Sequence, residues 1–422
     1  RAEVIYKGKT YAYPEDIKIA DGANTTYMLV CQKGSYHMMS DNYQEVIPEE
    51  VEAQILYLIN SADVRSNQIN SADVKDYKNS VSNIMNDERR TIKGTEIVAY
   101  ASPDGPEAKN NTLSDKRGAS AEKAFKTVSK NLETGEVETR SIGEDWEGFR
   151  ELVSNSNIED KDLIIRVLSM YSDPAVRERE IKNMSSVYKS LANGILPQLR
   201  RARFITSVEY KNYTPEELTD LVQNNIDVLD EEALLRAATL VEKADAKLAI
   251  YKQAINKYNS DRAKYNSAIV YLDEGKNADA KAMLDKVADN KKSCVKNAYG
   301  VIAMREKNYD EAARIFAEVT CNHGKVNSAV LDILNGKYSA AVEKLAGTGS
   351  DNEALAYLLV NQLDKAEAAI TCDCAKSYYL KAIIAARKGD AATANAMVQQ
   401  AAAKKASFEE RAANDVEFVK IR

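Results

Sequence analysis

The sequence predicts an α+β chain in three consecutive parts. These are an N-terminal β-rich segment over residues 1–48, an α/β domain over 49–213 with a helical insertion at about 143–199, and all-α helical repeats over 214–422. Three observations carry this prediction. Strand-like and helix-like patterns alternate through the α/β domain, strand patterns then stop, and small residues recur afterwards in a fixed helical register.

The first 48 residues contain three strand-like stretches that are separated by turn residues. They read VIYKGKTYAY, IKIADG and TTYMLVCQ. We expect this segment to be either the tail of an upstream β domain or an added edge of the domain that follows.

The next part shows four strand patterns and two helix patterns. The strands are expected at 54–59, 97–101, 137–142 and 203–210, and the helices at 71–85 and 113–128. The stretch between the third and fourth strands is too long for a plain loop. Its polar–apolar pattern, which includes the only tryptophan, Trp146, predicts helices there.

The most informative motif lies where the second strand leads into the second helix. A Pro-Asp-Gly turn around Asp104 follows the strand, and Ser114 is expected to open the helix. Asn110, the Leu-Ser pair that ends at Ser114, and Arg117 stand in the order Asn-x-x-Leu-Ser-x-x-Arg, with Gly118 after the arginine. This order resembles the signature of OmpA-like domains, which ends in alanine. The resemblance implies a fold in which this corner binds the diaminopimelate group of peptidoglycan.

The resemblance also implies roles for individual residues. Arg117 matches the arginine that binds the ligand's carboxylate, and the position of the aspartate that binds its amine is occupied by Ser102. The candidate peptidoglycan-binding residues are therefore Ser102, Asp104, Asn110 and Arg117. Asp104 either reaches the same pocket or is only a turn residue. Because losing an ionic contact to the amine costs about 1.5–3 kcal/mol, we predict weak or no peptidoglycan binding.

The second half of the chain repeats a pattern of small residues. The first marker of each unit is Ala268, Gly300, Ala329, Ala354 or Ala382, and successive markers lie 32, 29, 25 and 28 residues apart. The same register recurs in the second helix of each unit, at Ala280 and Leu284, Ala312 and Phe316, Ala341 and Leu345, Ala366 and Ile370, and Ala394 and Val398. Small residues let paired helices approach closely, while the large residue fills the space between neighbours.

The clearest unit, KNAYGVIAMREKNYDEAARIFAEV at 296–319, resembles a tetratricopeptide (TPR) repeat shortened from the usual length of about 34 residues. We expect a further unit at 231–258 and a terminal helix at 408–418 that caps the array. An OmpA-like domain followed by TPR-like repeats resembles cell-envelope proteins of Bacteroidota.

Composition argues against several kinds of chemistry. The net charge of −6 provides no basic face for nucleic acid. His37 and His323 lie far apart in sequence and in different predicted domains, which argues against histidine-based acid–base or metal chemistry. Cys372 and Cys374 are one residue apart, a poor geometry for a tetrahedral metal site without further ligands, so we interpret them as part of a loop between repeat helices. The sequence thus predicts a protein that is not an enzyme and has neither a cofactor nor a metal site.

No apolar run approaches the about 20 residues of a membrane-spanning helix. We therefore expect membrane association only through a part preceding Arg1 or through a partner. The resemblance implies a periplasmic protein at the outer membrane, and two functions remain open. One is a scaffold or subunit of an outer-membrane complex, with protein partners bound to the concave face of the TPR-like array. The other is a peptidoglycan-binding anchor between outer membrane and cell wall.

Overall fold

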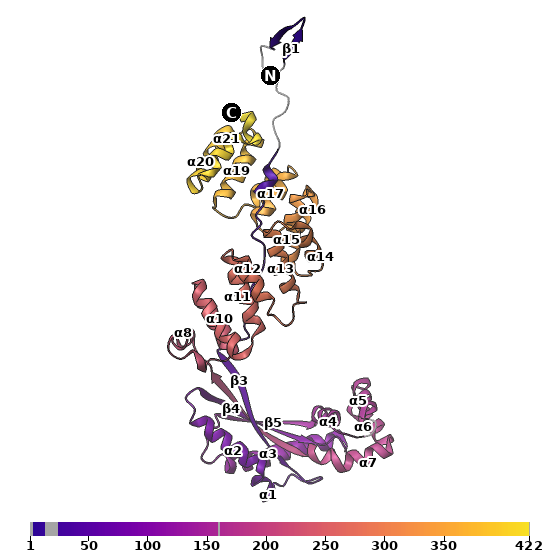
Figure 1. Ribbon diagram of the computed structural model, residues 1–422. Coiled ribbons are helices and arrows are strands. Elements are labelled where there is room, and N and C mark those ends of the chain that lie inside the picture. The colour runs from indigo at the N-terminus through magenta and orange to yellow at the C-terminus, as the bar shows by residue number, and fades with distance from the viewer. Residues whose placement is uncertain (1–2, 13–23, 159–160, 422) are drawn as a thin grey trace. The chain divides into compact units, whose positions relative to one another are not determined.

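A computed structural model describes residues 3–12, 24–158 and 161–421. The chain forms two compact units, one over Tyr43–Glu217 and the other over Leu218–Arg422 together with the N-terminal residues up to Asn42. The structure is α+β, with a small sheet and an array of helical repeats (Figure 1).

The first strand-like stretch, VIYKGKTYAY, falls on a hairpin rather than on a single strand, with β1 (Glu3–Tyr6) antiparallel to β2 (Lys9–Ala12). Lys7 and Gly8 at its turn both have positive φ angles, 49° and 75°, as two-residue hairpin turns require. The second stretch, IKIADG, lies outside the described residues. The strand prediction for TTYMLVCQ was wrong, because Thr26–Leu29 forms a 3₁₀ turn, η1, and the chain beyond it pairs with no strand among the described residues.

The sheet of the 43–217 unit has the order β3–β6–β4–β5. Its strands are β3 (Val46–Leu56), β4 (Arg90–Ala101), β5 (Glu136–Glu144) and β6 (Arg201–Lys211). The strand β6 is antiparallel to both β3 and β4, while β4 and β5 are parallel. Alternate residues of β6, including Phe204, face a core that they share with α2 (Ala72–Met85) and α3 (Glu107–Val128). Both helices therefore cover the same face of the sheet.

Three predicted boundaries in this unit were wrong. The strand expected at 54–59 ends at Leu56 and begins at Val46, and the strand expected at 97–101 begins at Arg90. Glutamates and arginines obscured both strands, but these charges pair across the sheet, as Glu49 does with Arg90 at 2.8 Å.

The third error concerns the start of α3, which begins at Glu107 rather than at Ser114. Pro106 occupies the N-cap position, where the lack of an N–H costs nothing. Ser114 lies inside the helix and is buried; its Oγ accepts a hydrogen bond from the backbone N–H of Gly143 at 3.1 Å. It therefore ties α3 to β5 instead of capping the helix.

The predicted insertion is helical, as expected. It consists of α4 (Trp146–Ser154), α5 (Lys161–Met170), α6 (Pro174–Asn183), α7 (Ser185–Gly194) and the 3₁₀ turn η2 (Leu196–Leu199). These elements enclose a small apolar core of their own, which contains Phe149 and Leu168.

Helices alone make up the described chain beyond β6, so the prediction of an all-α second half is confirmed. The array begins with α8 (Pro215–Asn224), η3 (Ile226–Val228), α9 (Glu231–Thr239) and α10 (Ala244–Tyr258). Its helix pairs are α11 (Asp261–Asp273) with α12 (Asn277–Leu284), α13 (Ser293–Arg305) with α14 (Tyr309–Ala317), α15 (Asn322–Leu334) with α16 (Tyr338–Leu345), α17 (Asp351–Leu359) with α18 (Leu363–Ala368), and α19 (Ala375–Lys388) with α20 (Ala391–Lys404).

Extensive contacts join the two helices of a pair, such as α13 and α14, and smaller contacts join helices that are next but one, such as α13 and α15. Figure 1 shows these pairs following one another along the unit. The helices thus form an open solenoid rather than a closed bundle. The small markers and the large residues of the second helices are buried, apart from Ile370 and Val398, which pack partly buried against the same core.

Gly300 shows why small residues are required at the first marker. A Cβ added to Gly300 would lie 2.4 Å from a ring carbon of the buried Phe316 on the paired helix. We predict that Gly300→Ala destabilises the protein by about 1–3 kcal/mol, although alanine is the better helix former. Thermal unfolding measures this, with Gly194→Ala as control because nothing lies within 4 Å of that position. An unchanged melting temperature in Gly300→Ala would contradict the close approach.

The terminal helix predicted at 408–418 is broken in two. α21 (Ser407–Asn414) is followed by the 3₁₀ turn η4 (Val416–Ile421), with Asp415 between them. The buried Asp415 accepts a hydrogen bond from the Tyr379 hydroxyl at 2.7 Å, and Phe418 enters the core of the solenoid. This turn closes the last repeat.

Candidate functional site

The first helices of the repeat pairs form a continuous surface, which we call the A-helix face (α11, α13, α15, α17 and α19). Residues 24–42, here called the inserted segment, lie along this face. Three buried asparagines at equivalent places in the repeats bind the main chain of this segment. Each side-chain amide accepts a hydrogen bond from the N–H of one segment residue and donates one to the C=O of the same residue.

These paired bonds have short distances. Asn352 bonds the N–H and C=O of Cys31 at 2.7 and 2.9 Å. Asn327 bonds those of Ser35 at 2.6 and 2.8 Å, and Asn266 bonds those of Met39 at 2.7 and 2.9 Å. Asn297 adds a bond to the C=O of Ser35 at 2.9 Å and accepts one from Asn327 at 2.9 Å. The asparagines therefore bind the main chain of the segment at every fourth residue, through bonds that do not involve the side chains of Cys31, Ser35 or Met39.

These asparagines were not predicted as site residues, although the sequence contains a signal for them. Asn266, Asn327 and Asn352 each lie two residues before the small marker of their repeat. A polar residue that recurs at one position of the buried register indicates a shared main-chain ligand, because a buried amide needs partners. No pattern in the sequence indicates that the ligand is the chain's own N-terminal part.

The inserted segment is also part of the solenoid's apolar core. Leu29 and Val30 are 6% and 8% exposed and belong to the same buried cluster as Val301 and Phe316. Gly34 has φ +86°, and a Cβ there would lie 2.5 Å from the Val301 side chain, so only glycine fits. The segment is thus an integral element of the solenoid. The expectation that residues 1–48 are β-rich was therefore wrong for residues 24–42, which contain no strand and pack on the A-helix face.

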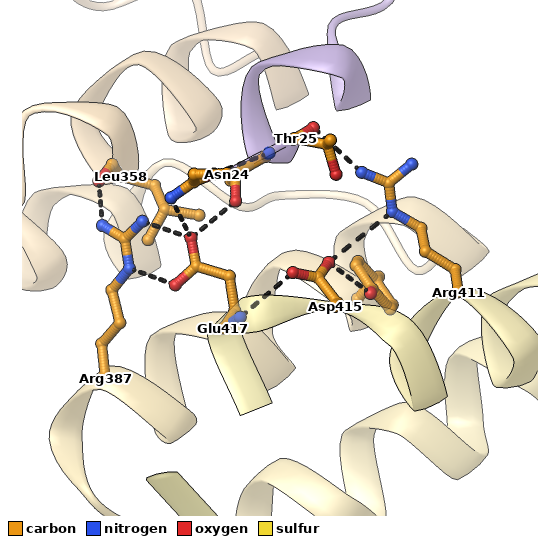
Figure 2. Close-up of polar contacts among 9 residues, drawn as sticks. Asn24, Thr25, Leu358, Arg387, Arg411, Asp415 and Glu417 are labelled. Carbon is orange, nitrogen blue, oxygen red and sulfur yellow. Dashed lines mark hydrogen bonds and ion pairs between the residues drawn. The ribbon is translucent and has the colours of Figure 1, made fainter. Parts of the chain in front are cut away.

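Hydrogen bonds to Glu417, which is itself paired with Arg387, hold the N-terminal end of the segment against the last repeat (Figure 2). Glu417 accepts hydrogen bonds from Thr26 Oγ1 at 2.5 Å and Asn24 Nδ2 at 3.2 Å, and pairs with Arg387 at 2.5 Å. Burial alone would raise the pKa of Glu417, but the bonds from Arg387 and Thr26 outweigh it and lower the pKa. The carboxylate therefore contributes stability above its usual pKa, and this contribution is lost as the pH falls through the lowered value.

Two further contacts hold the rest of the segment. Arg305 donates from Nε to the C=O of Lys33 at 2.8 Å. At the C-terminal end, Glu232 accepts from the N–H of Asn42 at 2.7 Å and pairs with Arg262.

The two histidines lie together, contrary to the expectation from their sequence separation. The rings of His37, in the segment, and His323, in α15, stack with centroids 4.8 Å apart. Ser35 Oγ lies 2.7 Å from His323 Nδ1, which is the spacing of a nucleophile and its base. Among the described residues, however, no group bonds the other ring nitrogen of His323 to orient it. The contact between Ser35 and His323 therefore fastens the segment to α15, and among the described residues it has no third member of a catalytic triad.

The histidine pair predicts a pH dependence. Burial, together with the neighbouring His37, lowers the pKa of His323. As the pH falls through about 6.5, the unfolded chain binds a proton before the folded one does, so acidification destabilises the docked state. Each unit by which folding lowers the pKa of His323 reduces the free energy of unfolding at acidic pH by about 1.4 kcal/mol. We expect the melting temperature to fall between pH 7.5 and pH 5.5, and to fall less in His323→Asn; equal slopes would contradict this.

The second candidate site is the corner between β4 and α3, where the four predicted residues line one cavity of about 730 Å³. Arg117 is 1% exposed, and its guanidinium donates to three backbone carbonyls, those of Ser61 at 3.0 Å, Tyr100 at 2.9 Å and Leu58 at 3.3 Å. Burial lowers the pKa of Arg117 to about 10. Its hydrogen-bonding capacity is largely used by the main chain.

The carboxylate of Asp104 also has partners. Arg200 Nη2 pairs with Asp104 Oδ2 at 3.0 Å, and Ser102 Oγ donates to Oδ1 at 2.8 Å. Asn110 donates to the C=O of Ser102 at 3.2 Å and to Glu144 at 2.8 Å, which fixes the turn. Asp104 was expected either to reach the pocket or to be only a turn residue. In the structure it lines the pocket and is paired there with Arg200. Arg200 was not predicted as a member of this site.

The pocket is basic. Lys109, Lys116, Arg117 and Arg200 line it, against the single carboxylate of Asp104. An ammonium group would meet a carboxylate that Arg200 already neutralises, while an anion would meet an excess of cations.

Comparisons with known proteins give a limited likeness. No protein-family model matches the chain, and no curated protein matches it either. Among solved structures, a tetratricopeptide repeat protein from Parabacteroides merdae is similar at 16% identity and a TM-score of 0.36, covering 49% of this chain and 90% of the other. PilF of Pseudomonas aeruginosa is similar at 17% identity and a TM-score of 0.35, covering 47% of this chain and 98% of its own.

No helix among the described residues is long and apolar enough to cross a membrane.

Proposed function

We propose that this protein is a non-enzymatic scaffold of the cell envelope, a periplasmic subunit of an outer-membrane complex that binds protein partners through its solenoid. The observation that carries the proposal is the inserted segment on the A-helix face. Its asparagine contacts and its buried Leu29 and Val30 brace successive repeats against one another. A solenoid braced in this way is a stiff support, and partners bind to surfaces other than the occupied A-helix face.

The α/β unit fits this proposal as an OmpA-like domain that serves as structure. Support comes from the corner pocket, where the residue that corresponds to the ligand's carboxylate binder, Arg117, holds three main-chain carbonyls in place. Asp104, the nearest substitute for the missing aspartate, is paired with Arg200. Both groups already have protein partners, which supports weak or no peptidoglycan binding.

The alternative function is a peptidoglycan-binding anchor. The observation in its favour is that Ser102, Asp104, Asn110 and Arg117 line one cavity with Arg200. If peptidoglycan displaces Arg200 from Asp104, the carboxylate becomes available for the ligand's amine.

Co-sedimentation with purified cell-wall sacculi separates the two functions. The scaffold proposal expects little co-sedimentation of the unmodified protein and a gain in Arg200→Gln, because that substitution frees Asp104. Asp104→Asn is the matched control, and Ser102→Asp restores the carboxylate of the OmpA-like signature. Strong co-sedimentation of the unmodified protein that Asp104→Asn abolishes would establish the anchor instead. Recovery of the native protein in the cytosolic fraction would contradict both functions.

A further inference from the structure

We propose that Asp351, Cys372 and Cys374 form a binding site for a thiophilic divalent cation such as Zn²⁺. Asp351 is the first residue of α17, Cys374 is the N-cap of α19, and Cys372 lies in the loop just before it. One ligand atom from each of the three residues lies within 4.8 Å of the other two. Cys372 is exposed, and the other two are half-buried, so an ion reaches the cluster from solvent.

The distances suit a tetrahedral ion. Cys374 Sγ lies 3.5 Å from Asp351 Oδ2, and Cys372 Sγ lies 3.9 Å from the same oxygen. With Zn–S near 2.3 Å and Zn–O near 2.0 Å, the sulfur–oxygen edge of a tetrahedron is about 3.5 Å and the sulfur–sulfur edge about 3.8 Å. In the sequence, the two thiols stand without an evident third ligand. The fold supplies the ligand from the preceding repeat.

Ser377 shows how the cluster is satisfied without an ion. Its Oγ lies 2.8 Å from Asp351 Oδ1, 3.0 Å from Cys372 Sγ and 3.4 Å from Cys374 Sγ. The Ser377 hydroxyl donates its one proton to the carboxylate, and the two protonated thiols donate to Asp351 or to Ser377. Binding a divalent cation releases the two thiol protons and forms two metal–sulfur bonds and one metal–oxygen bond. Ser377 Oγ or a water molecule then occupies the fourth position.

A disulfide between Cys372 and Cys374 is the other chemistry available to two neighbouring thiols. A disulfide needs no carboxylate, whereas a carboxylate held beside both sulfurs by a different helix is what a cation site requires. The ion would join α17 to α19, next to Asn352, which holds Cys31 of the inserted segment. Cation binding is therefore expected to raise the melting temperature of the solenoid.

Cobalt titration of the reduced, intact protein tests the site. We expect one Co²⁺ ion to bind per chain, with thiolate-to-cobalt absorption and visible bands as intense as those of tetrahedral cobalt. Binding of the metal is expected to release two protons, and Zn²⁺ is expected to displace the bound cobalt. Cys374→Ser preserves the N-cap, so it is expected to fold normally and to weaken binding by more than about tenfold, as are Cys372→Ser and Asp351→Asn. Cys294→Ser and Cys321→Ser are the matched controls and are expected to bind as the unmodified protein does.

Absence of thiolate-to-cobalt absorption in the reduced protein would overturn the proposal, as would equal binding in Cys372→Ser and the unmodified protein. Formation of a Cys372–Cys374 disulfide in a protein that binds no cation when reduced would assign the pair to redox chemistry instead.

Discussion

Replacing Asn266, Asn327 and Asn352 together by alanine is expected to release the inserted segment from the A-helix face. Each substitution removes two hydrogen bonds to the main chain of one segment residue. The N–H and C=O of Cys31 and Met39 and the N–H of Ser35 lose these asparagine partners, while the C=O of Ser35 keeps its bond from Asn297. A cost of about 2 kcal/mol for each asparagine, or about 6 kcal/mol for the triple variant, follows from ordinary hydrogen-bond energetics. That is comparable with the whole stability of many domains.

The measurement is thermal unfolding together with limited proteolysis of residues 24–42. Asn256→Ala is the control, because Asn256 is an exposed asparagine inside α10. We expect the triple variant to unfold at a lower temperature and to be cleaved within the segment under conditions that leave the control intact. A triple variant as stable and as resistant as the control would show that the asparagines do not hold the segment.

The second large effect is expected for Arg117→Ala. The substitution empties a buried position and removes the donor from three backbone carbonyls in two separate stretches of the α/β unit, those of Leu58 and Ser61 after β3 and that of Tyr100 in β4. We predict a loss of at least about 4 kcal/mol of unfolding free energy. Urea unfolding measures it, with Lys116→Ala as the exposed neighbour for control. Arg117→Lys is expected to fall in between, because one ammonium cannot span three carbonyls.

Arg117→Ala is therefore a poor variant for testing ligand binding. A loss of sacculus binding in Arg117→Ala would follow from unfolding alone, so substitutions at Asp104 and Arg200 are more informative. A stability of Arg117→Ala equal to that of Lys116→Ala would mean that the guanidinium is free for a ligand, and it would favour the peptidoglycan anchor.

The repeats were predictable because close packing of helix pairs demands small residues at fixed spacing. Gly300 and Phe316 in facing helices illustrate the demand, and such a pattern is local enough to be read from a single sequence. Strand β6 was predictable for the same reason, since its buried and exposed residues alternate. Strand β3 was predicted only at its end, because Glu49, Glu50 and Glu52 are typical of a loop. In the sheet, Arg90 of β4 and Arg203 of β6 pair with Glu49 and Glu52.

The four residues of the corner pocket could be grouped from the sequence because they lie within one short stretch. They are Ser102, Asp104, Asn110 and Arg117. The A-helix face was not, because its contacts join residues up to 321 positions apart, as in the bond between Cys31 and Asn352. The stretch TTYMLVCQ has the β-branched and aromatic composition of a strand. Its extended part is bound by side chains of helices rather than by another strand, and no local pattern distinguishes these two kinds of partner.

Residue-resolved hydrogen exchange on the intact protein tests most directly whether the inserted segment is docked. The amides of Cys31, Ser35 and Met39 donate to asparagine side chains, whereas those of Gln32 and Gly34 make no hydrogen bond to the described residues. We predict that the three bonded amides exchange about 100-fold or more slowly than the two others, corresponding to about 2.8 kcal/mol of opening free energy. Uniformly fast exchange throughout residues 24–42 would contradict a solenoid braced by its own N-terminal segment.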